Sequence, residues 1–350
     1  MSTSSGKVTF AVKLNAYALP GDTPYADFEE IAVAADRLGY DGVYLIDHLS
    51  MPNDQLAGFS SLLEEERPFF PDTWTMLGAL ARDTTRVRLG PQVTPLVRLH
   101  PVNLARAGAA IDWISGGRFV LQVGAGWNQA EYEQFGFPFV ESFQERYERT
   151  LEGVRLIRQL WTTDGPVSFE GKYYSLDEAP LWPKPTAQPA PPIWIGGSSK
   201  RMRRAVAEVG DAWTPAAPHY NGMTPESYRE GIEEIRNAAV EEFGRAADDI
   251  LAAAFLFVVV EETRERAIET AEHLLRRPLW NELSVEDLGA RGIALIGDPD
   301  EVSAGLRRFA DAGVEYFTIA FMPIRGSEET VRSMSLFAEQ VMPQFASDPA

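Results

Sequence analysis

Residues 117–128, Gly-Arg-Phe-Val-Leu-Gln-Val-Gly-Ala-Gly-Trp-Asn, join a continuous apolar strand to a glycine turn and decide the fold. The apolar run before Gly124 is too continuous for a strand with one wet face, so it predicts a parallel strand covered on both faces. Gly124 and Gly126 lack a Cβ atom, which permits positive φ and lets a flat ligand or a phosphate approach the backbone. The alternative is an ordinary turn between a strand and a helix, with Trp127 covering the core.

The same alternation of apolar strands and amphipathic helices continues through the chain. Strands are expected at 8–14, 42–46, 87–93, 117–126, 193–195, 212–214, 250–260 and 316–319. Helices are expected at 25–38, 73–82, 101–114, 146–161, 201–209, 224–243 and 263–275, and a last one from Asp298-Pro299. This α/β pattern without a linker predicts an eightfold (β/α) TIM barrel, formed by one domain over residues 1–350. A doubly wound sheet is the alternative, although eight units exceed what one such sheet usually uses.

Three segments interrupt the alternation and are expected to be insertions in the barrel. The first, 49–71, is far longer than a usual βα loop of about 2–6 residues, which makes it a candidate lid. The second, 164–192, is rich in proline, and a small hairpin is expected within it at 167–176. The third, 277–292, is expected to be irregular.

Composition excludes several classes of function. The chain has 350 residues, no cysteine and a formal net charge of -19. The charge argues against nucleic-acid and anionic-membrane partners, and the missing cysteines exclude disulfides, thiolate metal sites and a cysteine nucleophile. The sequence also lacks a signal-peptide pattern and an apolar run long enough to cross a membrane, so a cytoplasmic location is expected.

Four strand ends carry polar or glycine-rich residues, and a parallel barrel would bring them to one face. They are Asp47-His48, Gln92-Val93-Thr94, Gly124-Ala125-Gly126-Trp127 and Gly196-Gly197-Ser198-Ser199. His48 has the pKa class that gives or takes a proton near neutral pH, although a lone histidine is more often an ordinary hydrogen-bonded residue. Residues 196–199 enter a helix and suit a phosphate, or equally an ordinary serine N-cap. No metal-ligand, P-loop, Rossmann or nucleophile-elbow motif is present.

Several motifs together resemble the bacterial luciferase-like flavin/deazaflavin oxidoreductase superfamily. The resemblance spans residues 8–322 and rests on Asp47-His48-Leu49, Leu89–Pro95, His100-Pro101, Gly117-Arg118-Phe119, Gly124–Asn128 and Pro192–Ser198. One branch of this superfamily uses coenzyme F420, a deazaflavin hydride carrier, and the other uses reduced FMN with dioxygen. The Asp-His pair and the Gly-Ala-Gly-Trp-Asn turn resemble the coenzyme F420 branch more closely.

The resemblance implies a role for each strand end. His48 would be the proton donor or acceptor beside the ring, and Asp47 would hydrogen-bond the cofactor. The Gln92–Val93 peptide would match the non-proline cis bond behind the ring, next to Thr94. Ala125, Gly126 and Trp127 would line the ring site, and Gly196, Gly197, Ser198 and Ser199 would bind the phosphate.

The chain departs from the sugar-phosphate dehydrogenases of this superfamily, which argues against a sugar phosphate as substrate. They carry a carboxylate directly after the G-x-G, where this chain has Trp127. They also carry a tryptophan shortly after the Asp-His pair, where this chain has residues 49–52, Leu-Ser-Met-Pro. An apolar wall above the ring is expected instead, with Trp127, Phe59, Phe69, Phe70 and Trp74 as candidates, although Trp74 is better suited to the core.

The sequence therefore predicts a hydride-transferring oxidoreductase that uses coenzyme F420 and a small organic substrate. An FMN-dependent monooxygenase is the alternative, and a cofactor-binding barrel without turnover is the third possibility. Barrels of this kind often pair, so a homodimer is expected by analogy.

Overall fold

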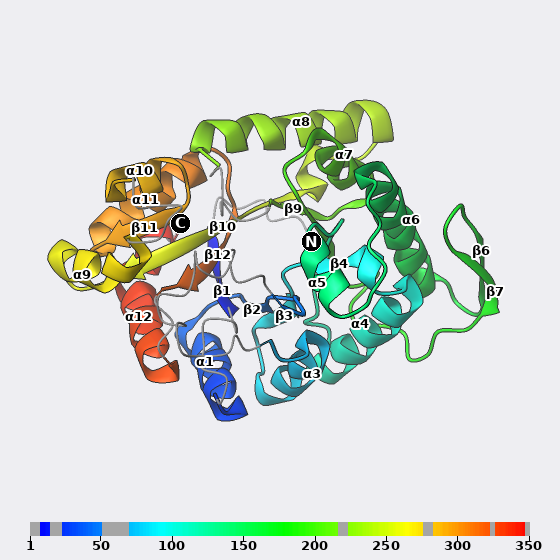
Figure 1. The fold of residues 1–350 in the computed structure, drawn as a ribbon, viewed down its shortest axis with the longest axis horizontal. Helices are drawn as coiled ribbons and strands as arrows, with labels where there is room; N and C mark the ends of the chain where they lie inside the picture. The colour runs from blue at the N-terminus through cyan, green and yellow to red at the C-terminus, as the bar shows by residue number, and fades with distance from the viewer. Residues whose placement is uncertain are drawn as a thin grey trace.

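The computed structural model describes residues 8–14, 23–50, 70–215, 223–275, 283–322 and 326–346. Parallel strands lie at the centre of the molecule, and helices surround them (Figure 1). Within the described ranges, no helix is long and apolar enough to cross a membrane.

The central sheet forms a nearly closed parallel barrel. Its strands, in spatial order, are β3 (Arg88–Pro91), β2 (Gly42–Leu45), β1 (Thr9–Leu14), β12 (Tyr316–Phe321), β10 (Leu251–Val260), β9 (Ala212–Thr214), β8 (Ile193–Gly196), β5 (Leu121–Gly124) and β4 (Thr94–Pro95). A bridge between Leu89 of β3 and Phe119, two residues before β5, closes this order. There the Leu89 amide donates to the Arg118 carbonyl at 3.0 Å, and the Val120 amide donates to the Leu89 carbonyl at 2.8 Å. The predicted barrel is thereby confirmed.

The third position of the barrel holds two short strands where the sequence predicted one. β3 pairs with β2, and β4 pairs with β5. Between them lies the cis Gln92–Val93 peptide bond, as the family resemblance implied. The backbone therefore changes partners at the point where the predicted site begins.

The main helices are α1 (Tyr25–Leu38), α3 (Thr73–Asp83), α4 (Pro101–Ser115), α6 (Phe143–Thr162), α7 (Lys200–Val209), α8 (Pro225–Phe243), α9 (Arg264–Leu275), α11 (Pro299–Asp311) and α12 (Ser327–Gln340). Local sequence sets their ends. Gly39 ends α1 with φ 95°, and Asp298 begins α11 by accepting from the amides of Asp300 and Glu301 at 3.0 Å each. The predicted bounds of α1 agree with the structure.

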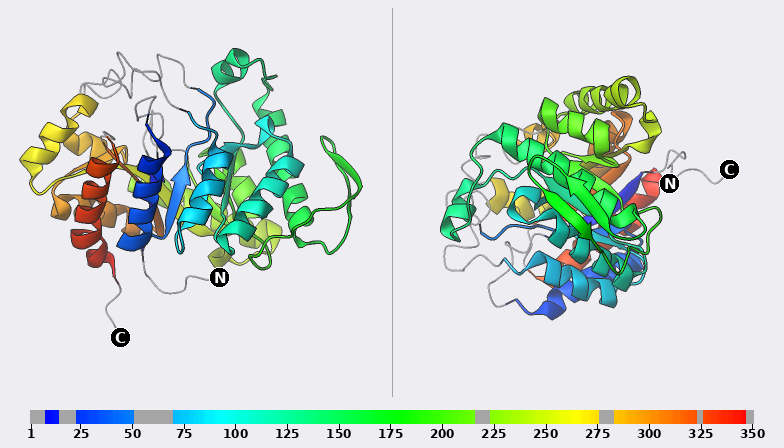
Figure 2. Two further views of the ribbon diagram at one scale, coloured as in Figure 1. Left: turned by 90° about the horizontal axis from the view of Figure 1, so that it is seen from below. Right: turned by 90° about the vertical axis from the view of Figure 1, so that its right-hand side faces the viewer.

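The predicted insertions have different outcomes. The hairpin expected at 167–176 is present as antiparallel β6 (Val167–Glu170) and β7 (Ser175–Ala179), and Figure 2 shows it standing out from the barrel. The prediction of an irregular segment at 277–292 was wrong in part, because α10 (Val285–Ala290) lies within it. Residues 277–282 lie outside the described residues. Ser284 caps this short helix, and Leu288 buries itself in the core. Residues 51–69 of the candidate lid lie outside the described residues.

The expected count of eight strands and eight helices was too low at the C-terminal end. β11 (Ala294–Gly297) pairs with Phe257–Val260 of β10, beyond the part of β10 that pairs with β9. The ten-residue β10 is long enough to serve both partners. α12 follows β12, so the helix beginning at Asp298 is not the last one.

The barrel interior contains a compact cluster of seven inward-facing residues, here called the inner cluster. Its members are Ala11, Tyr44, Val120, Trp194, Ala212, Ala253 and Tyr316. The Tyr44 and Tyr316 hydroxyls hydrogen-bond to each other at 2.9 Å, which satisfies two polar groups inside the barrel. This cluster fills the barrel below the strand ends.

Candidate functional site

Asp47 follows β2 and is held by three side chains from other elements. Thr94 Oγ1 donates to Asp47 Oδ2 at 2.6 Å, and Trp74 Nε1 donates to the same oxygen at 3.3 Å. The Arg98 guanidinium forms an ion pair with Oδ1, and both side chains are about 5–6% exposed. Asp47 therefore has protein partners for both oxygens, and its predicted contact with a cofactor stays a prediction.

His48 lies beside this pair and is anchored through one ring nitrogen. Its Nδ1 lies 2.9 Å from Glu131 Oε2, and the Leu49 amide donates to the same oxygen at 3.2 Å. Because an ionised carboxylate only accepts hydrogen bonds, this contact places the proton on Nδ1, and Nε2 has no hydrogen-bond partner among the described residues. The His48 side chain is 14% exposed, whereas that of Glu131 is 1% exposed. A partly exposed imidazole that is held by a buried carboxylate is suited to proton transfer.

Glu131 and Arg98 join these groups into one network. Arg98 Nη1 lies 4.0 Å from Glu131 Oε1, and it also donates to the Asp47 carbonyl at 3.3 Å. One guanidinium thus stands between two buried carboxylates. The sequence-based prediction missed both residues. Glu131 lies in the short helix α5 (Gln129–Gln134), just after the glycine turn, and its polar surroundings in the sequence gave no signal of its burial.

The glycine turn after β5 brings Trp127 to the histidine. The Trp127 and His48 rings meet edge to face, with centroids 5.8 Å apart, and Trp127 is half exposed. Gly126 has φ 73°, and a Cβ atom there would lie 3.2 Å from both Tyr132 Oη and Val97 Cγ2. Ala125 is buried. The turn thus depends on glycine for both its conformation and its close packing.

Val93 connects two of the predicted glycine segments. A Cβ atom on Gly124 would lie 3.0 Å from Val93 Cγ2, and one on Gly196 would lie 3.3 Å from Val93 Cγ1. Gln92 points into the barrel, where its Nε2 donates to Thr214 Oγ1 at 3.3 Å. The missing Cβ atoms let the Val93 side chain pack closely against the ends of β5 and β8, which brings these strand ends together.

Residues 197–199 form the turn before α7. Gly197 has φ 105°, and Ser199 Oγ accepts from the Met202 amide at 3.3 Å, as an N-cap does. Ser198, Ser199 and Lys200 are exposed. The Ser199 side chain is thus a cap, while the first amides of α7 remain suited to an anion. The described contacts do not join this turn to His48, and phosphate binding here stays a prediction.

The aromatic candidates have mixed outcomes. Phe59 and Phe69 lie outside the described residues. Phe70 packs, partly buried, against the core. Trp74 also packs against the core and contacts the Phe119 ring with a centroid separation of 5.9 Å, but its Nε1 reaches Asp47. Trp127 is thus the described aromatic side chain that is both exposed and in contact with His48.

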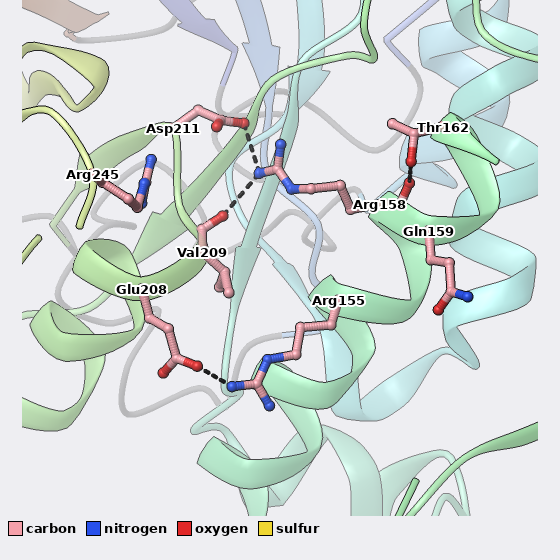
Figure 3. Close-up of a pocket in the computed structure, with 8 residues that line it drawn as sticks. All are labelled: Arg155, Arg158, Gln159, Thr162, Glu208, Val209, Asp211 and Arg245. Carbon is pink, nitrogen blue, oxygen red and sulfur yellow. Dashed lines mark hydrogen bonds and ion pairs between the residues drawn. The ribbon is translucent and has the colours of Figure 1, made fainter. Parts of the chain in front are cut away.

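A separate pocket of about 510 Å³ lies at the opposite end of the barrel, where strands begin (Figure 3). Its charged groups already have partners. Arg158 pairs with Asp211 at 3.0 Å, and Arg155 pairs with Glu208. Arg245 donates to three backbone carbonyls at the end of α7, the shortest to Gly210 at 2.7 Å. These arginines stabilise the end of a helix, and this pocket shares no residue with the predicted site.

Comparisons with known proteins agree with this architecture. The chain is 30% identical over 337 residues to the "F420-dependent glucose-6-phosphate dehydrogenase" of Nakamurella multipartita, covering 91% of this chain and 92% of that protein. Among solved structures, a monooxygenase from Streptomyces bottropensis superposes with TM-score 0.78 at 25% identity, covering 97% of this chain and all of that one. An F420-dependent secondary alcohol dehydrogenase superposes with TM-score 0.77 at 21% identity, with the same coverage.

A family model also matches most of the chain. The model of the family described as luciferase-like monooxygenase matches residues 8–316, which include all of the predicted site residues and the barrel strands as far as the first residue of β12. The resemblance drawn from the sequence motifs is confirmed. This chain belongs to the luciferase-like monooxygenase family.

Proposed function

We propose that this chain is an oxidoreductase that transfers a hydride between coenzyme F420 and a small organic substrate. The observation that carries the proposal is the His48–Glu131 pair beside the glycine turn: the buried carboxylate fixes Nδ1 and leaves Nε2 open. The names of several curated relatives support the choice of cofactor, among them the Nakamurella multipartita enzyme.

The cofactor supplies the hydride chemistry, and the protein supplies binding, orientation and a proton. His48 Nε2 gives or takes the proton that accompanies hydride transfer. Glu131 is a positioning residue that holds the imidazole tautomer, and Leu49 adds a backbone donor to the same oxygen. Asp47, fixed by Arg98 and Thr94, keeps the strand end rigid next to His48.

The proposed cofactor site extends across three strand ends. Residues 92–94 would lie behind the ring, and residues 125–127 would line its edge. Residues 196–199 receive the phosphate at the start of α7, where Lys200, Arg201, Arg203 and Arg204 give a strongly basic helix in a chain of net charge -19. Close backbone approach at Gly124 and Gly196 supports this assignment.

Glucose 6-phosphate is the first substrate to assay, because the names of the curated relatives include it as their substrate. Trp127 is the position at which the sequence motifs depart from the resemblance to the sugar-phosphate dehydrogenases. A half-exposed indole beside His48 gives the substrate an apolar wall. An uncharged alcohol or carbonyl compound is therefore the second class to assay.

The turnover assay mixes enzyme and oxidised coenzyme F420 without oxygen, adds glucose 6-phosphate and follows the deazaflavin absorbance. We expect the absorbance to fall at a rate that oxygen does not change. Consumption of dioxygen with reduced FMN and formation of an oxygenated product would favour the monooxygenase instead. Tight binding of coenzyme F420 with no turnover of either substrate class would favour a cofactor-binding barrel.

We also propose that two copies pair through the outer face of α4. Trp113 and Ile114 are 64% and 46% exposed there, and the charged residues of α4 are Arg106 and the fully buried Asp112. Strongly acidic chains repel each other, so an apolar face without an exposed acidic residue is where a second copy can dock. Light scattering should give twice the 38.8 kDa of one chain, and Trp113→Glu should give the single chain. Val240→Glu, at an exposed apolar position on α8, should leave the mass unchanged.

A further inference from the structure

Lys13 is a buried amine inside the barrel that the proposed chemistry does not use. It lies on β1 two residues beyond Ala11, which belongs to the inner cluster, and it is in register with Tyr44 of the same cluster. Alternate residues of a strand face the same side, so Lys13 points into the barrel one step nearer the site. Its Nζ lies 4.2 Å from the centre of the Phe255 ring, and the residue is 6% exposed.

Lys13 belongs to a polar layer that we call the barrel floor. Each member lies two residues after an inward-facing residue on its own segment of the barrel. That preceding residue belongs to the inner cluster or is Gly90, which is in register with Tyr44. The polar members, at most 6% exposed, are Lys13, Gln92, Gln122, Thr214 and Thr318. Gly124 follows Gln122 by two residues on β5, so the glycine turn of the site stands directly above this floor.

Several polar groups of the barrel floor have no hydrogen-bond partner among the described residues. Gln92 donates to Thr214, but Gln92 Oε1, both amide atoms of Gln122 and Thr318 Oγ1 have no partner among the described residues. No described carboxylate pairs with Lys13, and Tyr44, its titratable neighbour in register, is already bonded to Tyr316. Buried polar groups are normally satisfied, so a cluster of unsatisfied ones is expected where a ligand supplies the missing partners.

We propose that Lys13 binds an acceptor oxygen of the substrate that enters the barrel from the strand ends. An ammonium only donates hydrogen bonds, which fits a carbonyl, an alkoxide or a phosphate oxygen and does not fit an apolar group. This assignment rests on the proposed function, and it places the polar end of the substrate on the floor below the apolar Trp127 wall.

Burial alone lowers the pKa of Lys13 from 10.5 to about 7. A lysine whose pKa is lower in the folded state than in the unfolded state destabilises the fold below the folded pKa. This cost is relieved as the pH rises from about 7 toward the unfolded value. An uncharged replacement should therefore stabilise the protein most at and below neutral pH.

The test compares Lys13→Met with the unchanged protein in two readouts. The first is the melting temperature without ligands from pH 6 to pH 9. We expect Lys13→Met to melt a few degrees higher at pH 6 and to lose this advantage as the pH rises. The second is KM for glucose 6-phosphate together with Kd for coenzyme F420. We expect KM to rise about tenfold or more while Kd stays within about twofold, because the lost bond is made to the substrate.

A matched control is Lys184→Met. Burial also lowers the pKa of Lys184, but its Nζ donates to the Leu160 carbonyl at 2.7 Å, far from the barrel floor. This variant should melt lower and bind both ligands as before. The inference is overturned if Lys13→Met melts lower than the unchanged protein, which would give Lys13 a structural role. A loss of coenzyme F420 affinity with an unchanged KM would also overturn it. If the proposed function is wrong, the unchanged protein itself will show no turnover with coenzyme F420. The melting temperatures will still show whether Lys13 stabilises the fold.

Discussion

His48→Asn should lower kcat for hydride transfer by about 10²–10⁴-fold, the usual contribution of a positioned acid or base. Asparagine has about the same reach and keeps a hydrogen bond to Glu131 Oε2, but it cannot exchange a proton near neutral pH. Steady-state kinetics with coenzyme F420 measure the change, and a fluorescence titration checks that cofactor affinity is retained. The loss should therefore appear in kcat and leave cofactor binding intact.

His100→Asn is the matched control for this variant. His100 caps α4 by accepting from the Val102 amide at 3.2 Å, and its ring packs against Tyr174 with centroids 5.4 Å apart. Its loss should lower stability slightly and leave kcat unchanged. A His48→Asn enzyme that keeps kcat within about threefold of the unchanged enzyme contradicts the role of His48 as a catalytic residue.

Arg98→Met should lower the free energy of unfolding by about 3–5 kcal/mol, the usual effect of breaking a buried ion pair from one side. Methionine keeps much of the side-chain volume but leaves Asp47 and Glu131, with side chains 6% and 1% exposed, without their cation. Urea unfolding at neutral pH measures the loss. Activity should fall as well, because Glu131 positions His48 and Asp47 precedes it directly.

Two further variants separate this network from the general effect of removing a cation. Arg98→Met combined with Asp47→Asn should recover part of the stability, because one of the two uncompensated charges is gone. Arg308→Met removes an exposed arginine on α11 and should change the free energy of unfolding by less than about 0.5 kcal/mol. Equal stability of Arg98→Met and the unchanged protein would show that the network is not held together by this guanidinium.

The barrel could be predicted from the sequence because its strands are buried on both faces and its helices have clear ends. Continuous apolar runs such as 251–260 and glycine stops such as Gly39 give signals that depend on neighbouring residues alone. β11 was missed although residues 293–296 form an apolar run between Gly292 and Gly297, because the run is short. It pairs with an extension of β10 outside the path of the barrel. Pairing between distant segments cannot be recognised from such a short run.

For the candidate site, the sequence identified only the residues at the strand ends. Asp47, His48, Thr94 and Trp127 are in contact as a parallel barrel requires. Glu131 lies in a polar helix that looks solvent-exposed, and Arg98 lies in the short 3-10 turn Leu96–Arg98 after β4. Their burial follows from tertiary packing, which a single sequence does not encode locally. Lys13 was hidden for the same reason, because an alternating strand gives no sign that its polar residue faces a closed barrel.

The most direct test of the proposed function is a competition between cofactors. Purified protein is titrated with coenzyme F420 and with FMN, each in the oxidised and the reduced state, and binding is followed by fluorescence. We expect coenzyme F420 to bind at micromolar concentration or tighter and FMN to bind at least about tenfold more weakly, a difference of about 1.4 kcal/mol. Tighter binding of reduced FMN, with coenzyme F420 unable to displace it, would contradict hydride transfer to a deazaflavin as the function of this chain.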